Sequence, residues 1–178
     1  MYGFRIPPVI KNLIIINILI FLAQYTLGPM WDQRLTNLFG LHEVHSPLFR
    51  PHQLITYAFL HGNWPHVLYN MFGLWMFGAM LENHWGAKRF LIFYVVSAIG
   101  AAVVHLAVLY FETVPLIQAS YQYPVELRQQ FLEVNGLSQA TVGASGAIFG
   151  CLAAMAWLFP NQYVYFNFIF PISLVSPS

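Results

Sequence analysis

The sequence is poor in charged residues and in cysteine. Only 7% of its 178 residues are charged, whereas 58% are hydrophobic. Charged residues usually make up about a quarter of a soluble domain, so this composition excludes an ordinary water-soluble globule. The net charge of +1 comes without a basic stripe, and we expect no nucleic-acid partner. The single cysteine, Cys151, excludes an internal disulfide and a thiolate metal cluster, and we expect it to pack inside a helix.

Runs without charged residues locate the membrane-spanning segments. A spanning helix needs about 20 apolar residues. The charge-free runs predict spans at about 12–31, 64–83, 90–111 and 142–159, with a partial fifth at 163–175. The second span is expected to begin near Trp64-Pro65, because proline suits the first turn of a helix. The predicted fold class is all-α: a polytopic transmembrane helix bundle that forms one membrane domain over residues 1–178, with loops at 29–63 and 112–141.

The distribution of basic residues predicts an orientation in the membrane. With the N-terminus inside, the cytoplasmic side carries only Glu82 as an acidic residue, against Arg5, Lys11, Lys88 and Arg89. The positive-inside rule therefore predicts a cytoplasmic N-terminus. The first span is too long for a signal-peptide core and no small-x-small site follows it, so we expect it to be retained. We expect a multi-pass integral protein of a bacterial cytoplasmic (inner) membrane.

Two polar side chains open the second span. His66 and Asn70 are four residues apart, so they share one face of a helix and can point at a common spot. Polar side chains inside a membrane are costly, and they usually face the bundle interior, a cavity or a partner. One interpretation is hydrogen bonding between helices that only holds the bundle together. The other is a functional site.

A glycine-rich segment opens the fourth span. Gly146 and Gly150 form a small-xxx-small pattern that lets two helices approach closely, and on that interpretation Ser145 is one more small packing residue. The alternative makes Ser145 a nucleophile about one turn into the helix, where Gly143 and Gly146 let another chain approach. Free backbone N–H groups of the first turn would then face a developing negative charge. The segment is not the G-x-S-x-G elbow of α/β hydrolases, because Ala147 takes the place of the last glycine.

Together the two segments supply parts that peptide hydrolysis would need. Ser145 would attack the scissile carbonyl, while His66, Asn70 and the backbone N–H of Ser145 would donate hydrogen bonds to the oxyanion. One such donor typically lowers the barrier by about 3 kcal/mol.

From about Gln53 to Phe159 the sequence resembles the rhomboid intramembrane serine proteases. The resemblance rests on four stretches in this order: Gln53-Leu-Ile-Thr-Tyr-Ala-Phe-Leu-His61, His61-x4-His66-x3-Asn70-Met-Phe-Gly, Gly78-Ala-Met-Leu-Glu82-Asn-His-Trp-Gly86-Ala-Lys-Arg89-Phe and Gly143-Ala-Ser145-Gly146. It implies a bundle of six transmembrane helices that cleaves the transmembrane segments of other membrane proteins without a cofactor.

The resemblance also implies roles for single residues. Ser145 would be the nucleophile, and His66 and Asn70 would stabilise the oxyanion. Glu82 and Arg89 would take structural positions near the turn between the second and third spans. The loop at 29–63 would lie partly in the outer leaflet.

The chain departs from the family pattern in its catalytic base. Family members pair the serine with a histidine two spans later, whereas no histidine follows Gly146 here. A hydroxyl without its general base is a poor nucleophile. We therefore expect a truncated or frame-shifted rhomboid, or a fragment of one, that is inactive as it stands. His105 in the third span is a candidate substitute base on grounds of depth alone, and the favoured explanation is a hydrogen bond to a neighbouring helix or a place in a polar cavity.

Other functions compete with proteolysis. A non-catalytic relative would keep the bundle and bind or escort membrane clients, but it would need neither Ser145 nor the His66–Asn70 pair. A transporter would usually need more spans, and no paired broken helices are visible. His42-x-x-His45 with Glu43 could form part of a metal site, but no HExxH motif is present, and we expect no metal. The expected partners are the lipid bilayer and a substrate's transmembrane helix, and the sequence leaves the oligomeric state open.

Overall fold

The computed structural model describes residues 6–137, 139–160, 163–166 and 170–173. Its α-helices are α1 (Pro8–Thr26), α2 (Pro29–Phe39), α3 (Gln53–Thr56), α4 (Trp64–Gly73), α5 (Ala79–Trp85), α6 (Ala87–Ser120), α7 (Val125–Val134) and α8 (Ser145–Leu158). A 3-10 turn, η1 (Tyr57–Phe59), follows α3, and a π-helical segment, η2 (Leu74–Gly78), joins α4 to α5. Two short strands, β1 (Tyr163–Phe166) and β2 (Phe170–Ser173), pair antiparallel after α8.

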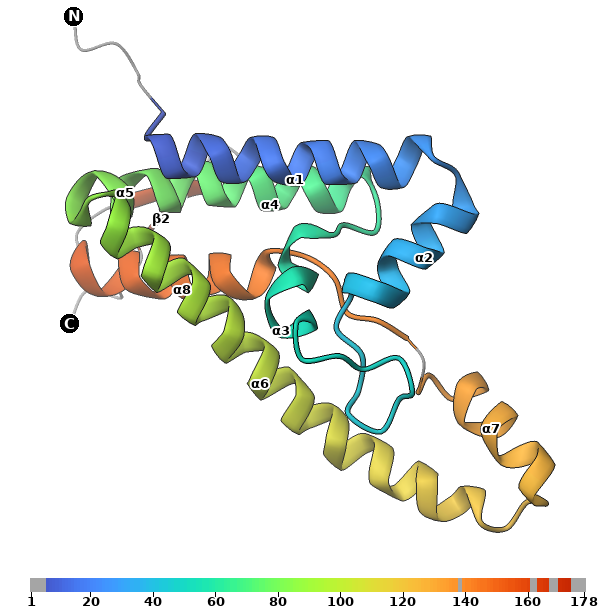
Figure 1. Ribbon diagram of the computed structural model, residues 1–178. Coiled ribbons are helices and arrows are strands. Elements are labelled where there is room, and N and C mark those ends of the chain that lie inside the picture. The colour runs from blue at the N-terminus through green and yellow to red at the C-terminus, as the bar shows by residue number, and fades with distance from the viewer. Residues whose placement is uncertain (1–5, 138, 161–162, 167–169, 174–178) are drawn as a thin grey trace, which may run out of the picture.

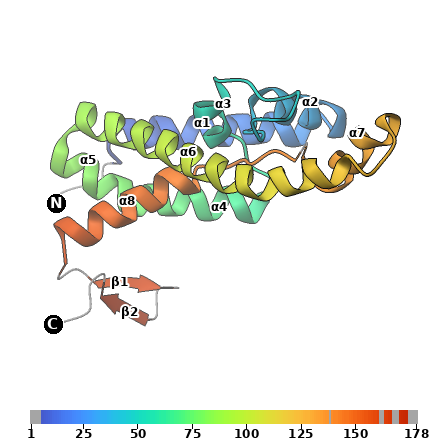
Figure 2. The ribbon, with the colours of Figure 1, turned by 90° about the horizontal axis from the view of Figure 1, so that it is seen from below.

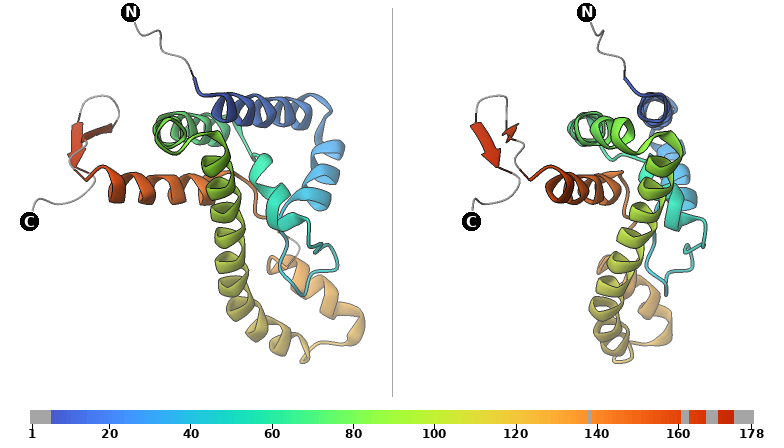
Figure 3. Two further views of the ribbon diagram at one scale, coloured as in Figure 1. Left: turned by 60° about the vertical axis from the view of Figure 1, so that its left-hand side comes forward. Right: turned by 90° about the vertical axis from the view of Figure 1, so that its left-hand side faces the viewer.

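The helices pack in a bundle around the continuous α4–η2–α5 helix. α1 lies alongside this helix and antiparallel to it, and α6 turns back from the end of α5 (Figure 1). α8 packs on α6 and on η2, and the views in Figure 3 show α6 crossing α1 steeply. Leu74, Phe90 and Ala147 are buried where these elements meet. α7 lies at the far end of α6 from the C-terminal hairpin (Figure 2).

Small residues let α8 approach α6 closely. A Cβ added to Gly146 would lie 2.5 Å from Cβ of Ala101, and one added to Gly150 would lie 2.7 Å from Oγ of Ser97. Neither position can carry a side chain unless the two helices move apart. The small-xxx-small interpretation of Gly146 and Gly150 is therefore confirmed.

The four full spans predicted are helical, but several ends differ. The second begins at Trp64 as expected and ends at Trp85. The first runs from Pro8 to Thr26 rather than from 12 to 31, because Lys11 lies exposed within the helix and Gly28, with φ of +87°, breaks the chain direction. Among the described helices, α1 and α6 are long and apolar enough to cross a membrane on their own.

The predicted loops contain more helix than expected. Residues 29–63 include α2, α3 and η1, and residues 112–141 include α7 and the last turns of α6, which continues past Glu112 to Ser120. The expected partial span at 163–175 is wrong where the structure describes it, since Tyr163–Phe166 and Phe170–Ser173 form strands. Residues 167–169 and 174–175 lie outside the described residues.

A buried carboxylate joins the first span to the second. Glu82, which is 3% exposed, accepts hydrogen bonds from the backbone N–H groups of Val9 (3.0 Å) and Ile10 (2.9 Å). These groups belong to the first turn of α1, where no intrahelical acceptor exists and negative charge is favoured. Glu82 thus caps a helix more than 70 residues away in the sequence. Arg89 lies exposed in the first turn of α6.

We expect Glu82→Ala to destabilise the protein, because two backbone donors would lose their shared acceptor. The cost is roughly 2–4 kcal/mol, and thermal unfolding of the purified chain in detergent would measure it. Glu112→Ala removes an exposed carboxylate at the other end of α6 and serves as the matched control. Equal melting temperatures for the two variants would contradict the cap.

Candidate active site

The first turn of α4 positions His66 and Asn70. Asn63 is the N-cap residue, and its Oδ1 accepts the backbone N–H of His66 at 2.8 Å. This cap and Pro65 fix where the helix begins. His66 therefore lies in the first turn, and Asn70 lies one turn further into the bundle on the same face. Asn70 is 6% exposed, and its Nδ2 has no hydrogen-bond partner among the described residues.

The geometry around His66 favours one tautomer of its ring. The backbone N–H of Gly62 donates to Nδ1 at 3.5 Å, a long hydrogen bond. If Nδ1 is the acceptor, the ring proton sits on Nε2. Nε2 is also the ring nitrogen that faces Gly143. His66 is thus arranged to donate a hydrogen bond toward the segment that precedes α8.

α8 begins at Ser145, not one turn before it as predicted. Its N-cap residue is Ala144, and no side chain caps the helix. Alanine is a poor N-cap residue, and the first-turn N–H groups have no acceptor inside the helix. The start of α8 therefore presents uncapped backbone donors beside the partly exposed Ser145.

α8 is shorter than a full membrane crossing. Fourteen residues rise about 21 Å, which is less than the roughly 30 Å of a bilayer's hydrocarbon core. A helix of this length that ends at one membrane face begins inside the bilayer. In Figure 1, α8 starts near α3, part of the way along the bundle.

Gly143 brings the two predicted segments together. A Cβ added to it would lie 2.5 Å from Nε2 of His66 and 3.5 Å from Nδ2 of Asn70. Its φ of +120° also lies in the region that favours glycine. The groups that approach Gly143 are the two side chains that the sequence singled out, and the approach of another chain at this glycine stays a prediction. They meet the backbone two residues before Ser145.

The loop that precedes α4 holds Gly143 in place. The backbone N–H of Gly143 donates to the carbonyl of Tyr57 at 2.9 Å, and the Tyr57 hydroxyl donates to the carbonyl of Ala98 on α6 at 2.8 Å. Leu41 and Thr141 exchange a pair of backbone hydrogen bonds of 2.9 and 2.8 Å. Burial raises the pKa of Tyr57, which keeps its hydroxyl protonated as a donor. Sequence reasoning missed these contacts, since no local pattern marks them.

His105 also contacts the segment before Ser145. Its Nε2 lies 2.5 Å from Oγ1 of Thr141. Among the described residues no hydrogen bond joins a histidine to Oγ of Ser145. The contact agrees with the expectation that His105 bonds a neighbouring segment, and its role as a substitute base stays a prediction.

Two of the candidate metal ligands in the first loop contact each other. Glu43 accepts hydrogen bonds from the backbone N–H of His45 at 2.6 Å and from Nδ1 of its ring at 2.8 Å. A carboxylate used in this way closes the loop locally. Among the described residues no group of three potential ligands gathers at one point.

Comparison with known proteins adds a family match to this geometry. A family model described as "Rhomboid domain" matches residues 49–177. The chain is 28% identical over 171 residues to RHOMBOID-like protein 12, mitochondrial, of Arabidopsis thaliana. The aligned region covers 96% of this chain and 47% of that protein. It is also 34% identical over 119 residues to Rhomboid protein 1, mitochondrial, of Saccharomyces cerevisiae. Here the aligned region covers 67% of this chain and 28% of that protein.

A bacterial relative gives a similar match. The Rhomboid protease AarA of Providencia stuartii is 30% identical over 148 residues, covering 80% of this chain and 48% of that protein. The chain thus spans less than half the length of each of these three curated relatives.

We expect Gly143→Ala to disturb the contact with His66, because the new methyl group would overlap the ring and the backbone would be strained. The expected loss is roughly 1–3 kcal/mol of stability, measured by thermal unfolding in detergent. Gly100→Ala is the control, since a Cβ there meets nothing within 4 Å. A Gly143→Ala protein as stable as the control would show that the backbone does not pass against the ring.

We also expect stability to fall in mild acid because of His61, which precedes α4. Burial lowers the pKa of His61 to about 4, with a further contribution from nearby His66, against a partial rise from a backbone hydrogen bond at Phe59. The unfolded chain therefore binds a proton on His61 more readily than the folded one between pH 6.5 and about 4. This contribution is complete above pH 6.5 and is lost as the pH falls toward 4.

Melting temperatures measured in detergent from pH 7.5 down to pH 4 would test this expectation. The fall should be a few degrees and should be smaller in His61→Gln, which cannot take up the proton. An identical fall in the variant would assign the acid sensitivity to other groups.

Proposed function

The chain belongs to the rhomboid family, and from this premise we propose that it is a serine-type endopeptidase that cleaves transmembrane segments of membrane proteins within the bilayer. The observation that carries the proposal is the meeting of His66 and Asn70 with the Gly143 backbone at the uncapped start of α8. The homologues include proteins named as rhomboid proteases.

The proposed chemistry is acyl transfer with Ser145 as nucleophile. Its Oγ attacks the scissile carbonyl carbon and gives its proton to a base, and the carbonyl oxygen becomes negatively charged. The oxyanion accepts hydrogen bonds from Nε2 of His66, Nδ2 of Asn70 and the backbone N–H of Ser145. The C–N bond then breaks, the amine takes a proton, and water hydrolyses the resulting ester.

The free donors support this assignment of roles. A buried amide group that lacks a partner costs free energy, as does a helix start without a cap. Nδ2 of Asn70 and the start of α8 show both features next to one glycine. An oxyanion would satisfy these donors together. A packing role alone would not require Asn70 to leave its Nδ2 group unpaired.

In the family the proton acceptor is a histidine two spans after the serine, and the 178 residues hold no histidine after Gly146. His105 is the last histidine of the sequence, and its Nε2 contacts Thr141. The contact of His105 with Thr141 rather than with Ser145 supports a second candidate function, in which the chain binds membrane clients without cleaving them. In either case the proposed partners are a client's transmembrane helix and the lipid bilayer, and the proposed location is a bacterial cytoplasmic membrane with the N-terminus inside.

Labelling by a fluorophosphonate probe separates the two functions. The probe phosphonylates an activated serine, so the purified chain in detergent should be labelled slowly, and added imidazole should speed the reaction by acting as an external base. Ser145→Ala should abolish labelling, and Asn70→Ala should slow it by about 100-fold, since one oxyanion donor has that effect on rate.

Ser97→Ala is the matched control, because it removes a serine hydroxyl elsewhere in the bundle and should leave labelling unchanged. Labelling that persists in Ser145→Ala, or that never appears with imidazole, would refute the protease assignment and favour the client-binding one. A His105→Gln variant tests the substitute base: unchanged labelling without imidazole would remove His105 from consideration.

A further inference from the structure

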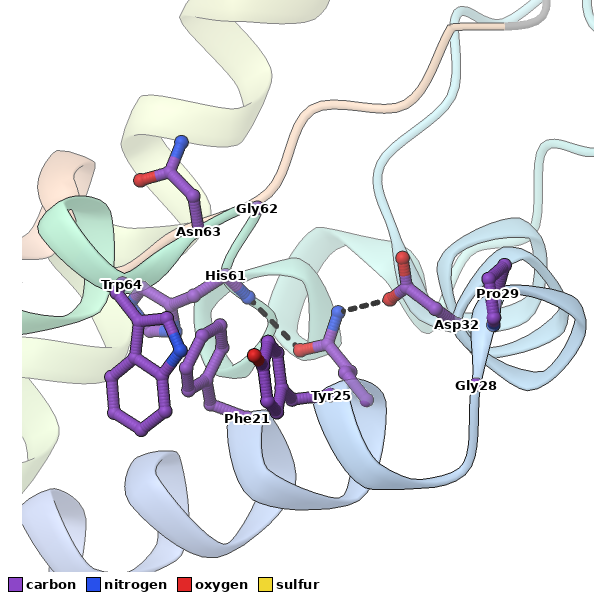
Figure 4. Close-up of a pocket in the computed structure, with 10 residues that line it drawn as sticks. Phe21, Tyr25, Gly28, Pro29, Asp32, His61, Gly62, Asn63 and Trp64 are labelled. Atoms are coloured by element: carbon purple, nitrogen blue, oxygen red, sulfur yellow. Dashed lines mark hydrogen bonds between the residues drawn. The ribbon is translucent and has the colours of Figure 1, made fainter.

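A cleft lies beside His61, at the end of α1. Its volume is about 360 Å³, and it is lined by residues from the end of α1, the start of α2 and the segment that leads into α4. Neither Ser145 nor Asn70 lines it. The volume is in the range of small-molecule sites, roughly 300–1,000 Å³. In Figure 4 the side chains of Phe21, Tyr25 and Trp64 lie together on one side and Asp32 lies on the other.

A carboxylate stands at one wall of the cleft. Oδ1 of Asp32 accepts a hydrogen bond from Nε2 of Gln24 at 2.9 Å, and Oε1 of Gln24 accepts the backbone N–H of His61 at 3.1 Å (Figure 4). Gln24 is 5% exposed, so a buried side chain holds the carboxylate in place.

Asp32 has no cationic partner among the described residues. The one ion pair described there joins His45 and Glu43, and the nearby Arg34 lies over the Trp31 ring at 5.3 Å. Asp32 is also only partly exposed. A fixed, partly desolvated carboxylate without a counter-charge favours a cationic ligand.

Aromatic rings form another wall of the cleft. The rings of Tyr25 and Trp64 meet edge to face, with centroids 5.6 Å apart, and Phe21 packs behind Trp64 at 4.9 Å. Phe21 is buried, whereas Tyr25 is 65% exposed and Trp64 is 44% exposed. Two accessible rings set at a steep angle offer faces to a cation, as the aromatic cages that bind ammonium groups do.

The position of the cleft indicates where its cationic ligand comes from. The cleft lies where α1 ends and α4 begins. Because both helices are taken to span the membrane, this place is at one of the two membrane surfaces. Exposed apolar side chains lie next to its lining residues in the sequence: Leu27, Met30 and Trp31. Tyrosine and tryptophan at such a place sit at the headgroup level of a bilayer. A ligand there is reached from the lipid rather than from bulk water.

We propose that this cleft binds the ammonium headgroup of a phosphatidylethanolamine lipid. The ammonium N–H groups donate to Asp32, the positive charge faces the rings of Tyr25 and Trp64, and the acyl chains lie along the exposed apolar surface. The inference does not rest on the proposed proteolysis, since it concerns other residues and requires no chemistry at Ser145.

Native mass spectrometry of the detergent-purified chain tests the proposal. The chain is mixed with phosphatidylethanolamine or with phosphatidylglycerol of identical acyl chains. It should retain phosphatidylethanolamine about fivefold to thirtyfold more strongly. Asp32→Asn keeps an acceptor for Gln24 but removes the charge, and it should reduce this preference to none. Glu112→Gln, which neutralises an exposed carboxylate elsewhere, should leave the preference intact.

Two results with the lipids alone would overturn the proposal. One is equal retention of the two lipids by the unaltered chain, a comparison that needs no variant to fold. The other is a preference that persists in Asp32→Asn. A second variant, Tyr25→Leu with Trp64→Leu, keeps the carboxylate but removes both rings, and it should lower retention of phosphatidylethanolamine while melting within a few degrees of the parent. Preferential retention of a lysine-bearing peptide over both lipids would assign the cleft to a peptide and refute the lipid proposal.

Discussion

The backbone at Gly143 passes directly against the His66 ring, with no side chain between them, and the candidate site depends on this contact. It places Nε2 of His66 and Nδ2 of Asn70 beside the segment that becomes α8 two residues later. Any other residue at position 143 would fill that space and would be strained at a φ of +120°. The site is therefore built by removing a side chain, and the uncapped helix start supplies the remaining donors.

Long-range hydrogen bonds explain why this contact can persist in an apolar bundle. Backbone groups cannot turn to water inside a membrane, so every break in a helix needs a partner from elsewhere in the chain. Glu82 supplies one for the start of α1, and the carbonyl of Tyr57 supplies one for Gly143. The loop at 29–63 thus supplies hydrogen-bond acceptors to the segment that precedes Ser145, as well as connecting two spans.

The sequence predicts the parts of this site better than their arrangement. Charge-free runs predict the helices, and the spacing of His66 and Asn70 predicts their common face, because both signals are local. The ends of α1 and α6 are missed, because Lys11 and Glu112 lie exposed within these helices. A charged residue marks the end of a span only where lipid would surround its side chain. The cap by Glu82 and the support from Tyr57 join residues far apart in sequence, and no periodicity encodes them. The roles of Ser145, His66 and Asn70 rest on the family resemblance together with this geometry.

The most direct measurement of the central contact is a nuclear Overhauser effect between the two groups that define it. In a chain labelled selectively at glycine and histidine, the account predicts a strong cross-peak between an Hα of Gly143 and Hε1 of the His66 ring, because a Cβ at that position would lie 2.7 Å from Cε1. Assigned resonances that show no such cross-peak, while other contacts of the His66 ring are visible, would contradict the account.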